Sequence, residues 1–481
     1  MRSIKRRVIK KKTRRRLSVS GKARRAKASV SSKASSRSTR YRRLKRGGNP
    51  QSSGTYGCVF YKPALRCANE PKRQDGISKL MLKRNMLEEI QEINSVKSVV
   101  SKIQNNEKYF LVQTTSQCTP GPLDKTEDLP GFDSICYNLN KRGFTAQNIN
   151  SKLNELAIIN IPYGGKDMDD FWEEFSLIES QAERNAVFIK TNKALIDLLF
   201  NGIQPLFKNG MIHNDVKAGN VLMDKNYNAR LIDWGLAFPF TAKNQALKRV
   251  PEKIKNYKSL IYNWPVSQLL FGQTDFMLSG SSSAIARNIV NDAVTKKGHI
   301  SHMTKLLTAV GVKAKVPADD DLRNAIAVLE EYLVAVLNKY KPSTRAPFDK
   351  YAFFTEVYAP NADLYGFLTI YEFFVLKNNV SLMPPLLVSR IKSMLNRYCI
   401  STEYATKQYN WQEIKQDLEA LNECCEALPE SGNRPALRES LNTFKMNPLN
   451  RQPMTTNMQP NTTNMQPVVT NMQPVMTNMQ L

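Results

Sequence analysis

Short apolar runs mark the first part of the chain. Between residues 54 and 115 they alternate with glycine and β-branched residues, as at 58–61 and 109–112. Short runs bounded by turn-forming residues predict strands. One stretch differs, because at 84–100 apolar residues recur every third position, which predicts a helix: Leu87, Ile90, Ile93 and Val96. We therefore expect a β-rich region that contains one helix.

Helical spacing dominates the later part of the chain. In 186–208 the apolar positions repeat at intervals of four, four and three residues, at Leu195, Leu199, Ile203 and Leu206. From 276 onward further helices are expected, notably at 321–338 and 364–376. A small β-rich lobe followed by a larger helical lobe is an α+β plan, and we expect a cleft between the lobes.

Charge separates the N-terminal segment from the rest. The 481 residues include 70 Lys and Arg against 42 Asp and Glu, a net charge of +28. Residues 1–46 hold 21 of the basic residues and no acidic one, which leaves +7 for the remaining 435 residues. A segment with so few large apolar side chains is predicted to be disordered. We therefore expect a basic tail at 1–47.

The C-terminal segment is of low complexity. Thr-Asn-Met-Gln recurs every seven residues from 456, and proline recurs in the same phase, which excludes a continuous helix. The folded part is therefore expected at about 48–450, with a repeat tail at 451–481. The sequence contains no run of 18 consecutive apolar residues, so no transmembrane helix is expected. The charged N-terminus lacks the apolar core of a secretory signal.

The seven cysteines are scattered and odd in number, with no C-x-x-C pair, and the chain has three histidines. This pattern does not indicate a zinc site, and it favours reduced cysteines in an intracellular protein.

The most informative stretch is 211–237, MIHNDVKAGNVLMDKNYNARLIDWGLA. Asp215, Lys217 and Asn220 follow one another at short spacing, and Asp233 comes thirteen residues later, after a predicted short buried strand at 231–232. Phosphoryl transfer needs a carboxylate that orients the attacking hydroxyl, and cations that neutralise the migrating phosphoryl group. Asp215 suits the base, Lys217 the γ-phosphate contact, and Asn220 with Asp233 the Mg²⁺ ligands.

HNDVKAGN and the later DWG resemble the protein-kinase signature H-R-D-x-K-x-x-N and D-F-G. The resemblance implies a bilobal kinase fold, with an N-lobe at 48–160 and a C-lobe at 161–450. It implies ATP and Mg²⁺ as cofactors, with Mn²⁺ as an alternative ion, and protein substrates. Lys217, two residues after Asp215, favours serine/threonine specificity of the EC 2.7.11 type. Asn214 replaces the usual arginine, which implies activity without phosphorylation of the activation loop, and Trp234 replaces phenylalanine.

Two upstream segments extend the resemblance. Residues 52–59, SSGTYGCV, resemble the glycine-rich loop, in which glycines let backbone amides approach phosphate. ISKL at 77–80 resembles the strand V-A-I-K, which makes Lys79 the expected α/β-phosphate contact, with Lys83 as the alternative. The implied nucleotide-binding residues of the loop are Ser52, Gly54, Thr55, Tyr56, Gly57 and Val59.

The lysine should pair with a carboxylate of the helix at 84–100. Glu89 is the preferred partner, because Ile93 and Val96 at +4 and +7 would face the core, and Glu88 and Glu92 are competitors. The strand and turn at 158–165 resemble the connection between lobes. There Ile159 would be the gatekeeper, and the backbone of Asn160 to Pro162 would bind the adenine edge.

Segments further along match the family less closely. NADLYG at 361–366 resembles the start of the central C-lobe helix, where Asp363 would brace the catalytic loop. Its distance from Asp233 implies a helical insertion at about 276–350. The activation segment could end at 250–252, VPE. The alternative at 261–267, IYNWPVS, is similar to kinases of large nucleocytoplasmic DNA viruses of the iridovirus and mimivirus type, as are GTYGCVF and ISKL. That similarity implies a viral protein of the host cytoplasm or nucleus, packaged in the virion.

Two other functions compete with a protein kinase. Small-molecule phosphotransferases of the aminoglycoside or choline kinase type share the H-x-D and I-D-W patterns, so Trp234 favours them, whereas Val59-Phe60 and Asp363 do not. A pseudokinase scaffold held on nucleic acid by the tail is the other alternative. The tail at 1–46 fits non-specific nucleic acid, anionic lipid or an import receptor equally well.

Overall fold

The computed structural model describes residues 50–426, apart from 54–56, 62, 71–75, 115, 247, 315–319 and 377–378. The described residues fall within one compact unit. The tails expected at 1–47 and 451–481 lie outside them. None of the described helices is long and apolar enough to cross a membrane.

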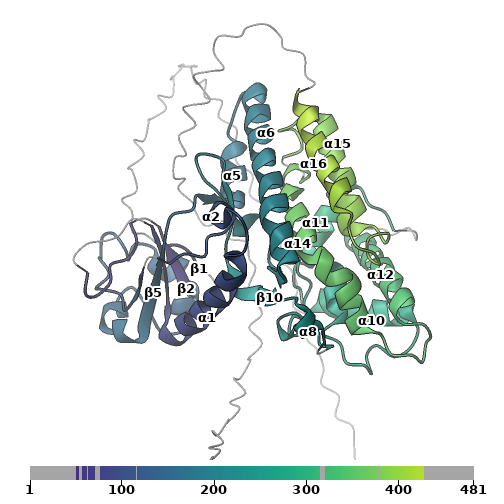
Figure 1. Cartoon of the computed structure of the whole chain (residues 1–481), viewed down its shortest axis with the longest axis horizontal. Helices are drawn as coiled ribbons and strands as arrows, with labels where there is room; N and C mark the ends of the chain where they lie inside the picture. Colours follow the sequence, from purple (N-terminus) through teal and green to yellow (C-terminus); the bar gives the residue numbers. More distant parts are fainter. Residues whose placement is uncertain are drawn as a thin grey trace, which may run out of the picture. The chain divides into compact units, whose positions relative to one another are not determined.

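The first lobe is built on an antiparallel sheet (Figure 1). Within the described residues its five strands are ordered β1-β2-β3-β5-β4. They are β1 (Pro50–Ser53), β2 (Gly57–Phe60), β3 (Ile77–Leu82), β4 (Ser116–Cys118) and β5 (Leu156–Ile161). Helix α1 (Lys83–Val100) begins directly after β3. These elements confirm the predicted strand near 58, the buried strand near 158 and the helix near 84–100.

A connection between β4 and β5 covers one side of this sheet. It holds the short helices α3 (Phe132–Ile135) and α4 (Tyr137–Asn140), followed by the 3-10 turns Ile149–Ser151 and Leu153–Glu155. Phe132, Leu139 and Ile149 from this connection are fully buried with residues of the strands in a hydrophobic cluster. The lobe therefore has a core of its own, separate from the core of the helices.

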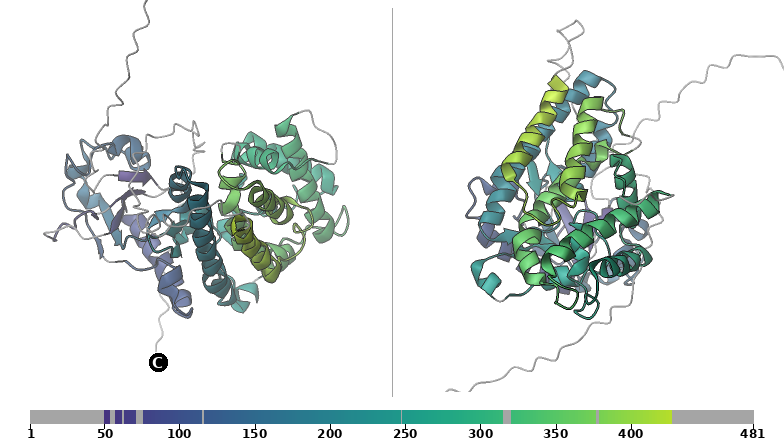
Figure 2. Two further views of the ribbon diagram at one scale, coloured as in Figure 1. Left: turned by 90° about the horizontal axis from the view of Figure 1, so that it is seen from above. Right: turned by 90° about the vertical axis from the view of Figure 1, so that its right-hand side faces the viewer.

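The second lobe is mainly helical, and Figures 1 and 2 show α15 and α16 side by side in yellow-green. Two short sheets, β6-β8-β9 and β7-β10, hold the central loops of this lobe. The strands are β6 (Lys166–Asp167), β7 (Met211–Ile212), β8 (Val221–Met223), β9 (Ala229–Leu231) and β10 (Phe238–Pro239). The helices are α5 (Met168–Phe175), α6 (Gln181–Asp197), α7 (Gln204–Lys208), α8 (Ala242–Ala246), α9 (Glu252–Lys255), α10 (Ser282–Thr295), α11 (Ile300–Val310), α12 (Asp321–Tyr340), α13 (Lys350–Phe353), α14 (Ala359–Thr369), α15 (Pro385–Leu395) and α16 (Trp411–Glu426).

The predicted α+β plan is confirmed, and so are most of the predicted helices. The helix expected at 186–208 begins earlier, at Gln181, because Ser180 caps it by accepting a hydrogen bond from the backbone N–H of Glu183. It continues through a π-helical segment, Leu198–Ile203, into α7. The helix expected at 321–338 is α12. Three helices, α10 to α12, occupy the region where an insertion was expected.

Two local predictions were wrong. Residues 109–112 do not form a strand: Tyr109 ends α2 (Asn106–Tyr109), and Phe110 makes only an isolated bridge to Leu231. Phe110 is nevertheless buried, because its ring packs against Trp234 at 5.7 Å between centroids. In α1, Leu87 is 60% exposed although its spacing predicted a core position.

The helix expected at 364–376 lies at an earlier position in the chain. Helix α14 begins at Ala359 and ends at Thr369, and a 3-10 segment, Ile370–Phe374, follows it. Every residue of α14 except Pro360 is buried. A helix that is buried on all sides has no polar face, so the apolar periodicity does not show where it begins or ends.

The prediction of reduced cysteines was also wrong. All seven cysteines lie in described residues, and four of them form the disulfides Cys58–Cys136 and Cys67–Cys118. The paired Cα atoms are 5.2 and 5.7 Å apart, which suits a disulfide. These pairs could not be predicted from the sequence, because 78 and 51 residues separate the partners and only the fold of the first lobe brings them together.

We expect these disulfides to stabilise the first lobe. Closing loops of 78 and 51 residues restricts the unfolded chain by about 4 kcal/mol each, and less in total because one loop lies inside the other. Protein purified without reductant and then denatured should show three reactive thiols, those of Cys399, Cys424 and Cys425. Reductant should lower the melting temperature of this protein but not that of a variant with all four paired cysteines replaced by serine. Seven reactive thiols would contradict the pairing.

Candidate active site

Helix α14 fixes the loop that follows β7. The Asp363 carboxylate accepts hydrogen bonds from the backbone N–H groups of His213 at 2.9 Å and Asn214 at 2.7 Å. Gly366, one turn later, allows close approach, since a Cβ there would lie 2.3 Å from the carbonyl oxygen of Val216. The predicted bracing of the loop by Asp363 is therefore confirmed. Burial raises the pKa of this carboxyl to about 6, although both backbone hydrogen bonds oppose the shift.

The imidazole of His213 connects two loops. The backbone N–H of Asp215 donates to its Nδ1 at 3.2 Å, so the proton lies on Nε2 and is donated to the carbonyl oxygen of Ile232 at 3.0 Å. Burial lowers the pKa of His213 to about 4, and the ring is therefore neutral near pH 7. Because Ile232 directly precedes Asp233, this hydrogen bond holds the loop of Asp233 against the loop of Asp215.

Three side chains hold the carboxylate of Asp215. Lys217 Nζ lies 3.0 Å from Oδ1 and 2.8 Å from Oδ2, Asn220 Nδ2 lies 2.8 Å from Oδ2, and Asn263 Nδ2 lies 2.9 Å from Oδ1. A carboxylate offers about four lone-pair positions, and these contacts use all of them. An incoming hydroxyl group could therefore bind Asp215 only after one donor moves away. Lys217 is the most mobile candidate because its side chain is 30% exposed.

Asn220 and Asp233, the predicted metal ligands, flank one strand pair. The N–H of Ile232 donates to the carbonyl oxygen of Asn220 at 3.0 Å, and Val221 pairs with Leu231. The Asn220 amide directs Nδ2 toward Asp215, so its Oδ1 points the other way. Asp233 has a left-handed backbone (φ 64°), and its exposed carboxylate has no hydrogen bond or ion pair with other described residues.

This donor set fits Mg²⁺. Among the described residues, no three His, Cys, Asp or Glu side chains gather into a metal site of their own. One amide oxygen and one unpaired carboxylate are instead typical of Mg²⁺ sites that phosphate oxygens and water complete. Asn220 and Asp233 would therefore hold the ion only together with a nucleotide.

Lys79 and Glu89 form the predicted pair, with 2.7 Å between Nζ and Oε1. Burial alone would lower the pKa of Lys79, but the charges of Glu89 and Asp233 outweigh it and raise the pKa above its usual value. Asp233 is thus close enough to act on Lys79. The alternative Lys83 is exposed and Glu88 is exposed as well, so neither takes part in this pair.

Glu92, the other competitor, pairs with a different lysine. Lys253 Nζ, in α9, lies 2.8 Å from Glu92 Oε1 and donates to the carbonyl oxygen of Gly235 at 2.8 Å. The ammonium group of Lys253 thereby joins three parts of the chain: helix α1, the loop after Asp233, and helix α9, which carries the lysine. Sequence analysis did not identify Lys253, because its two partners are distant in the chain and no motif contains it.

The predicted nucleotide-binding residues of the first lobe lie on three strands. Ser52, on β1, pairs with Val59, on β2, and a Cβ at Gly57 would lie 2.3 Å from the carbonyl oxygen of Leu80. The tip of the hairpin, with the predicted contacts Gly54, Thr55 and Tyr56, lies outside the described residues. Strand β2 is the neighbour of β3 in the sheet, and Val59 pairs with Lys79, so the second strand of the hairpin lies next to this lysine.

The predicted adenine contact is only partly accessible. Asn160 is buried between Ser78 and Ser116, and its side chain hydrogen-bonds to both serines. Its amide therefore stabilises the sheet, and the backbone available to a ligand begins at Ile161 and Pro162, which are both partly exposed. Ile159, the predicted gatekeeper, pairs with Lys79 across β3 and β5.

The segment at 261–267 ends beside the catalytic loop. Asn263 Nδ2 donates to Asp215 and to the carbonyl oxygen of Val216, and Trp264 Nε1 donates to the carbonyl oxygen of Asn214. The candidate at 250–252 makes no hydrogen bond to the catalytic loop among the described residues, and Glu252 instead pairs with Lys255. The sequence pattern YNWP marked this segment, but it did not show that Asn263 contacts the carboxylate.

Comparison with known proteins identifies the central segment. Residues 163–258 match the protein kinase domain family. A serine/threonine-protein kinase-like protein of Arabidopsis thaliana is 39% identical over 74 residues, 15% of this chain and 19% of the relative. Cyclin-dependent kinase 9 of Homo sapiens is 34% identical over 85 residues, 18% of this chain and 22% of the relative, and that of Danio rerio is 34% identical over 85 residues, 18% and 21%.

The chain thus spans about a fifth of the length of the curated relatives it matches. The matched segment holds Asp215, Lys217, Asn220 and Asp233, and both comparisons support the protein kinase family. Together with the arrangement of strands and helices, they show a bilobal α+β protein-kinase-like fold.

The two buried titrating groups predict opposite responses to acid. Between pH 7.5 and 5.0 the unfolded chain protonates His213 but the folded one does not, so this term lowers the free energy of unfolding by roughly 2 kcal/mol. Asp363 binds its proton in the folded state first, so its term raises the free energy of unfolding by roughly 1 kcal/mol over the same range.

Urea denaturation at both pH values would separate these terms. The destabilisation caused by His213→Gln should become smaller at pH 5.0 than at pH 7.5, because the unsubstituted protein has lost the histidine term. The destabilisation caused by Asp363→Asn should become larger at pH 5.0. Equal effects of each substitution at both pH values would contradict the assignments.

Proposed function

We propose that this protein is an ATP-dependent protein kinase that transfers the γ-phosphoryl group to serine or threonine, an EC 2.7.11-type activity. The observation that carries the proposal is the position of Asp215, whose carboxylate is held by Lys217, Asn220 and Asn263 at 2.8–3.0 Å. Lys217 two residues after Asp215 supports serine/threonine specificity, as does the Arabidopsis thaliana relative, which is named a serine/threonine-protein kinase-like protein.

Each residue then has a defined task. Lys217 moves from Asp215 toward the transferred phosphoryl group, which frees a lone pair of Asp215 for the substrate hydroxyl proton. Asn263 keeps Asp215 oriented during this exchange, because its second contact to the carbonyl oxygen of Val216 is independent of Lys217. Mg²⁺ and ATP, when bound, supply the phosphoryl group and neutralise its charge. Asn220 and Asp233 would hold the ion, and Lys79, oriented by Glu89, would hold the phosphates.

Transfer of labelled phosphate from ATP to protein in the presence of Mg²⁺ or Mn²⁺ tests this function. Phosphoserine or phosphothreonine should be the product, and Asp215→Asn should lower kcat at least about a hundredfold while its melting temperature stays close to that of the unsubstituted protein. Ser134→Ala, at an exposed position far from Asp215 in the chain, serves as a control. Phosphotyrosine as the only product would overturn the specificity. Labelling of kanamycin or choline but of no protein would favour a small-molecule phosphotransferase.

We also propose a viral origin for the protein and a place in the virion. The segments GTYGCVF, ISKL and YNWPVS support a relation to kinases of large DNA viruses. The two disulfides support an oxidising compartment such as the virion over the reducing host cytosol. Mass spectrometry of protein taken directly from virions, with free thiols blocked during lysis, would decide the point. Absence of the protein or reduced Cys58 and Cys67 would contradict this location.

The basic segment 1–46 is proposed to hold the protein on nucleic acid through its 21 positive charges. Deletion of 1–46 should abolish retention on DNA at moderate salt, and retention of the full chain should fall steeply as salt rises, because binding releases condensed counterions. Unchanged retention after the deletion would exclude this role. Binding to anionic vesicles but not to DNA would assign the tail to membranes instead.

A further inference from the structure

The positive charge of the folded part is concentrated in one stretch of the chain. Residues 241–313 hold eleven Lys and Arg against three Asp and Glu, a net charge of +8. The whole chain after residue 46 has a net charge of +7, so everything outside this stretch is close to neutral. The stretch includes α8 and α9, the segment at 261–267 that contacts Asp215, and the helices α10 and α11.

Most of these charges form no ion pair with the residues that the structure describes. Lys253, Lys255 and Lys296 pair with carboxylates. A further set is exposed and forms no ion pair within 4 Å with other described residues, although Arg287 lies close enough to Glu330 to affect it electrostatically: Arg249, Lys258, Arg287, Lys297, Lys305 and Lys313. We call these six residues the basic face. Exposed charges of one sign repel one another, so the face does not stabilise the fold by itself.

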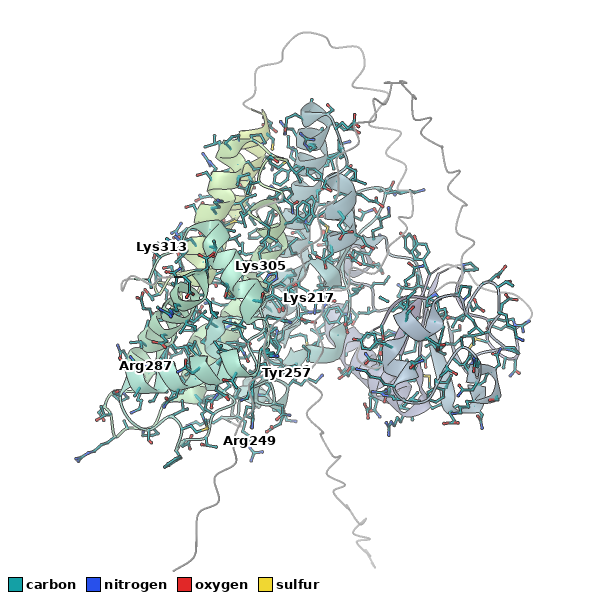
Figure 3. All side chains as sticks on the ribbon, turned by 180° about the vertical axis from the view of Figure 1, so that it is seen from behind. Lys217, Arg249, Tyr257, Arg287, Lys305 and Lys313 are labelled. Atoms are coloured by element: carbon teal, nitrogen blue, oxygen red, sulfur yellow. A yellow bond between two sulfur atoms is a disulfide. The ribbon has the colours of Figure 1, made fainter. Side chains whose placement is uncertain are left out.

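The basic face lies beside the catalytic residues. Figure 3 shows Arg249, Arg287, Lys305 and Lys313 on the same side of the molecule as Lys217 and Tyr257. Contacts establish how close the helix α11 comes: the N–H of Tyr262 donates to Nδ1 of His299 at 3.2 Å, and the N–H of His299 donates to the carbonyl oxygen of Leu260 at 2.9 Å. Since Asn263 contacts Asp215 directly, α11 begins next to the catalytic carboxylate.

The spacing of these charges suits an extended peptide. Lys297 lies two residues before His299, and Lys305 lies on the solvent side of α11, opposite the buried Met303 and Leu306. Six residues of helix from His299 to Lys305 rise about 9 Å, which is the length of about three residues of extended chain. A substrate whose hydroxyl reaches Asp215 would therefore place its next few residues along the basic face.

Three carboxylates lie at the start of α5, two in its first turn and one at its N-cap. Asp167, Asp169 and Asp170 lie near the catalytic loop, since a Cβ at Gly219 would be 3.1 Å from Asp169 Oδ2. All three already have interaction partners within the protein. Residues 241–313 nevertheless carry a net charge of +8.

We infer that the basic face selects acidic protein substrates, in which aspartate, glutamate or phosphorylated residues flank the acceptor serine or threonine. This inference rests on the proposed kinase function and names the substrate class of the same site. Attraction between exposed charges raises the rate of encounter and fixes the register of the peptide, and it weakens as salt rises.

Three peptides of equal length test the inference. Each has one acceptor serine in an alanine background, flanked by three aspartates, three asparagines or three lysines. We expect kcat/KM to fall in that order, with about a tenfold preference for the aspartate peptide over the asparagine peptide near 0.05 M salt and a smaller one near 0.3 M. A peptide copied from residues 27–43 of this chain, which has hydroxyl residues among basic ones, should be a poor substrate.

Charge reversal assigns the preference to the basic face. Lys258→Glu, Lys297→Glu and Lys305→Glu together should remove the preference for the aspartate peptide and improve the lysine peptide. The matched control reverses three exposed lysines elsewhere, Lys102, Lys193 and Lys208. Both variants keep the basic segment 1–46, so any binding of acidic peptides to that segment contributes equally to both.

The outcomes separate this inference from the proposed function. Transfer to serine with no charge preference, with a preference for lysine, or with the same loss in both triple variants would overturn the acidic-substrate inference and leave the kinase function standing. If no peptide accepts phosphate, the kinase function is in question. Fluorescence anisotropy of a labelled aspartate peptide then still tests whether the basic face binds acidic peptides. Its Kd should rise about tenfold in the basic-face variant and stay unchanged in the control.

Discussion

The arrangement of the site depends on one buried carboxylate. Asp363 accepts the backbone N–H groups of His213 and Asn214, and burial raises its pKa to about 6, so the interaction is made against a substantial desolvation cost. Two charge-assisted hydrogen bonds offset this cost and fix a left-handed residue, Asn214, at φ 59°. Together with the contacts from Lys217, Asn220 and Asn263, this support sets the direction in which the following Asp215 points.

From this carboxylate, a chain of hydrogen bonds reaches the first lobe. His213 connects to Ile232 and thus to the loop of Asp233, and Lys253 connects Gly235 of that loop to Glu92 of α1. Helix α1 also supplies Glu89, which holds Lys79. The arginine that would pair with a phosphorylated activation loop is absent, because Asn214 stands at its position. In its place, Asn214 accepts hydrogen bonds from Trp264 and Tyr358, and Lys253 links the loop after Asp233 to helix α1. The assembled site is thus held by groups that the chain itself carries.

The sequence predicted what depends on spacing within a motif. Asp215, Lys217 and Asn220 meet because they share one loop, and Lys79 meets Glu89 because a strand leads directly into a helix. Contacts between distant segments could not be predicted in this way. Asn263 meets Asp215 only through the packing of the second lobe, Lys253 meets Glu92 only where the lobes join, and the cysteine pairs are joined across 78 and 51 residues. The misplaced strand at 109–112 has the same cause, since burial of Phe110 came from Trp234 and not from a sheet.

The net charge of +28 is composed of two parts with different physical consequences. Residues 1–46 hold 21 positive charges and no acidic residue, which suits contact with any polyanion. The +8 of residues 241–313 belongs to a folded stretch that includes Asn263, which contacts Asp215, so its charges have defined positions relative to the reacting hydroxyl. Charges at defined positions can distinguish one peptide sequence from another. Residues 1–46 contain no acidic residue, so they hold no acidic group that could compete with acidic substrates for the basic face.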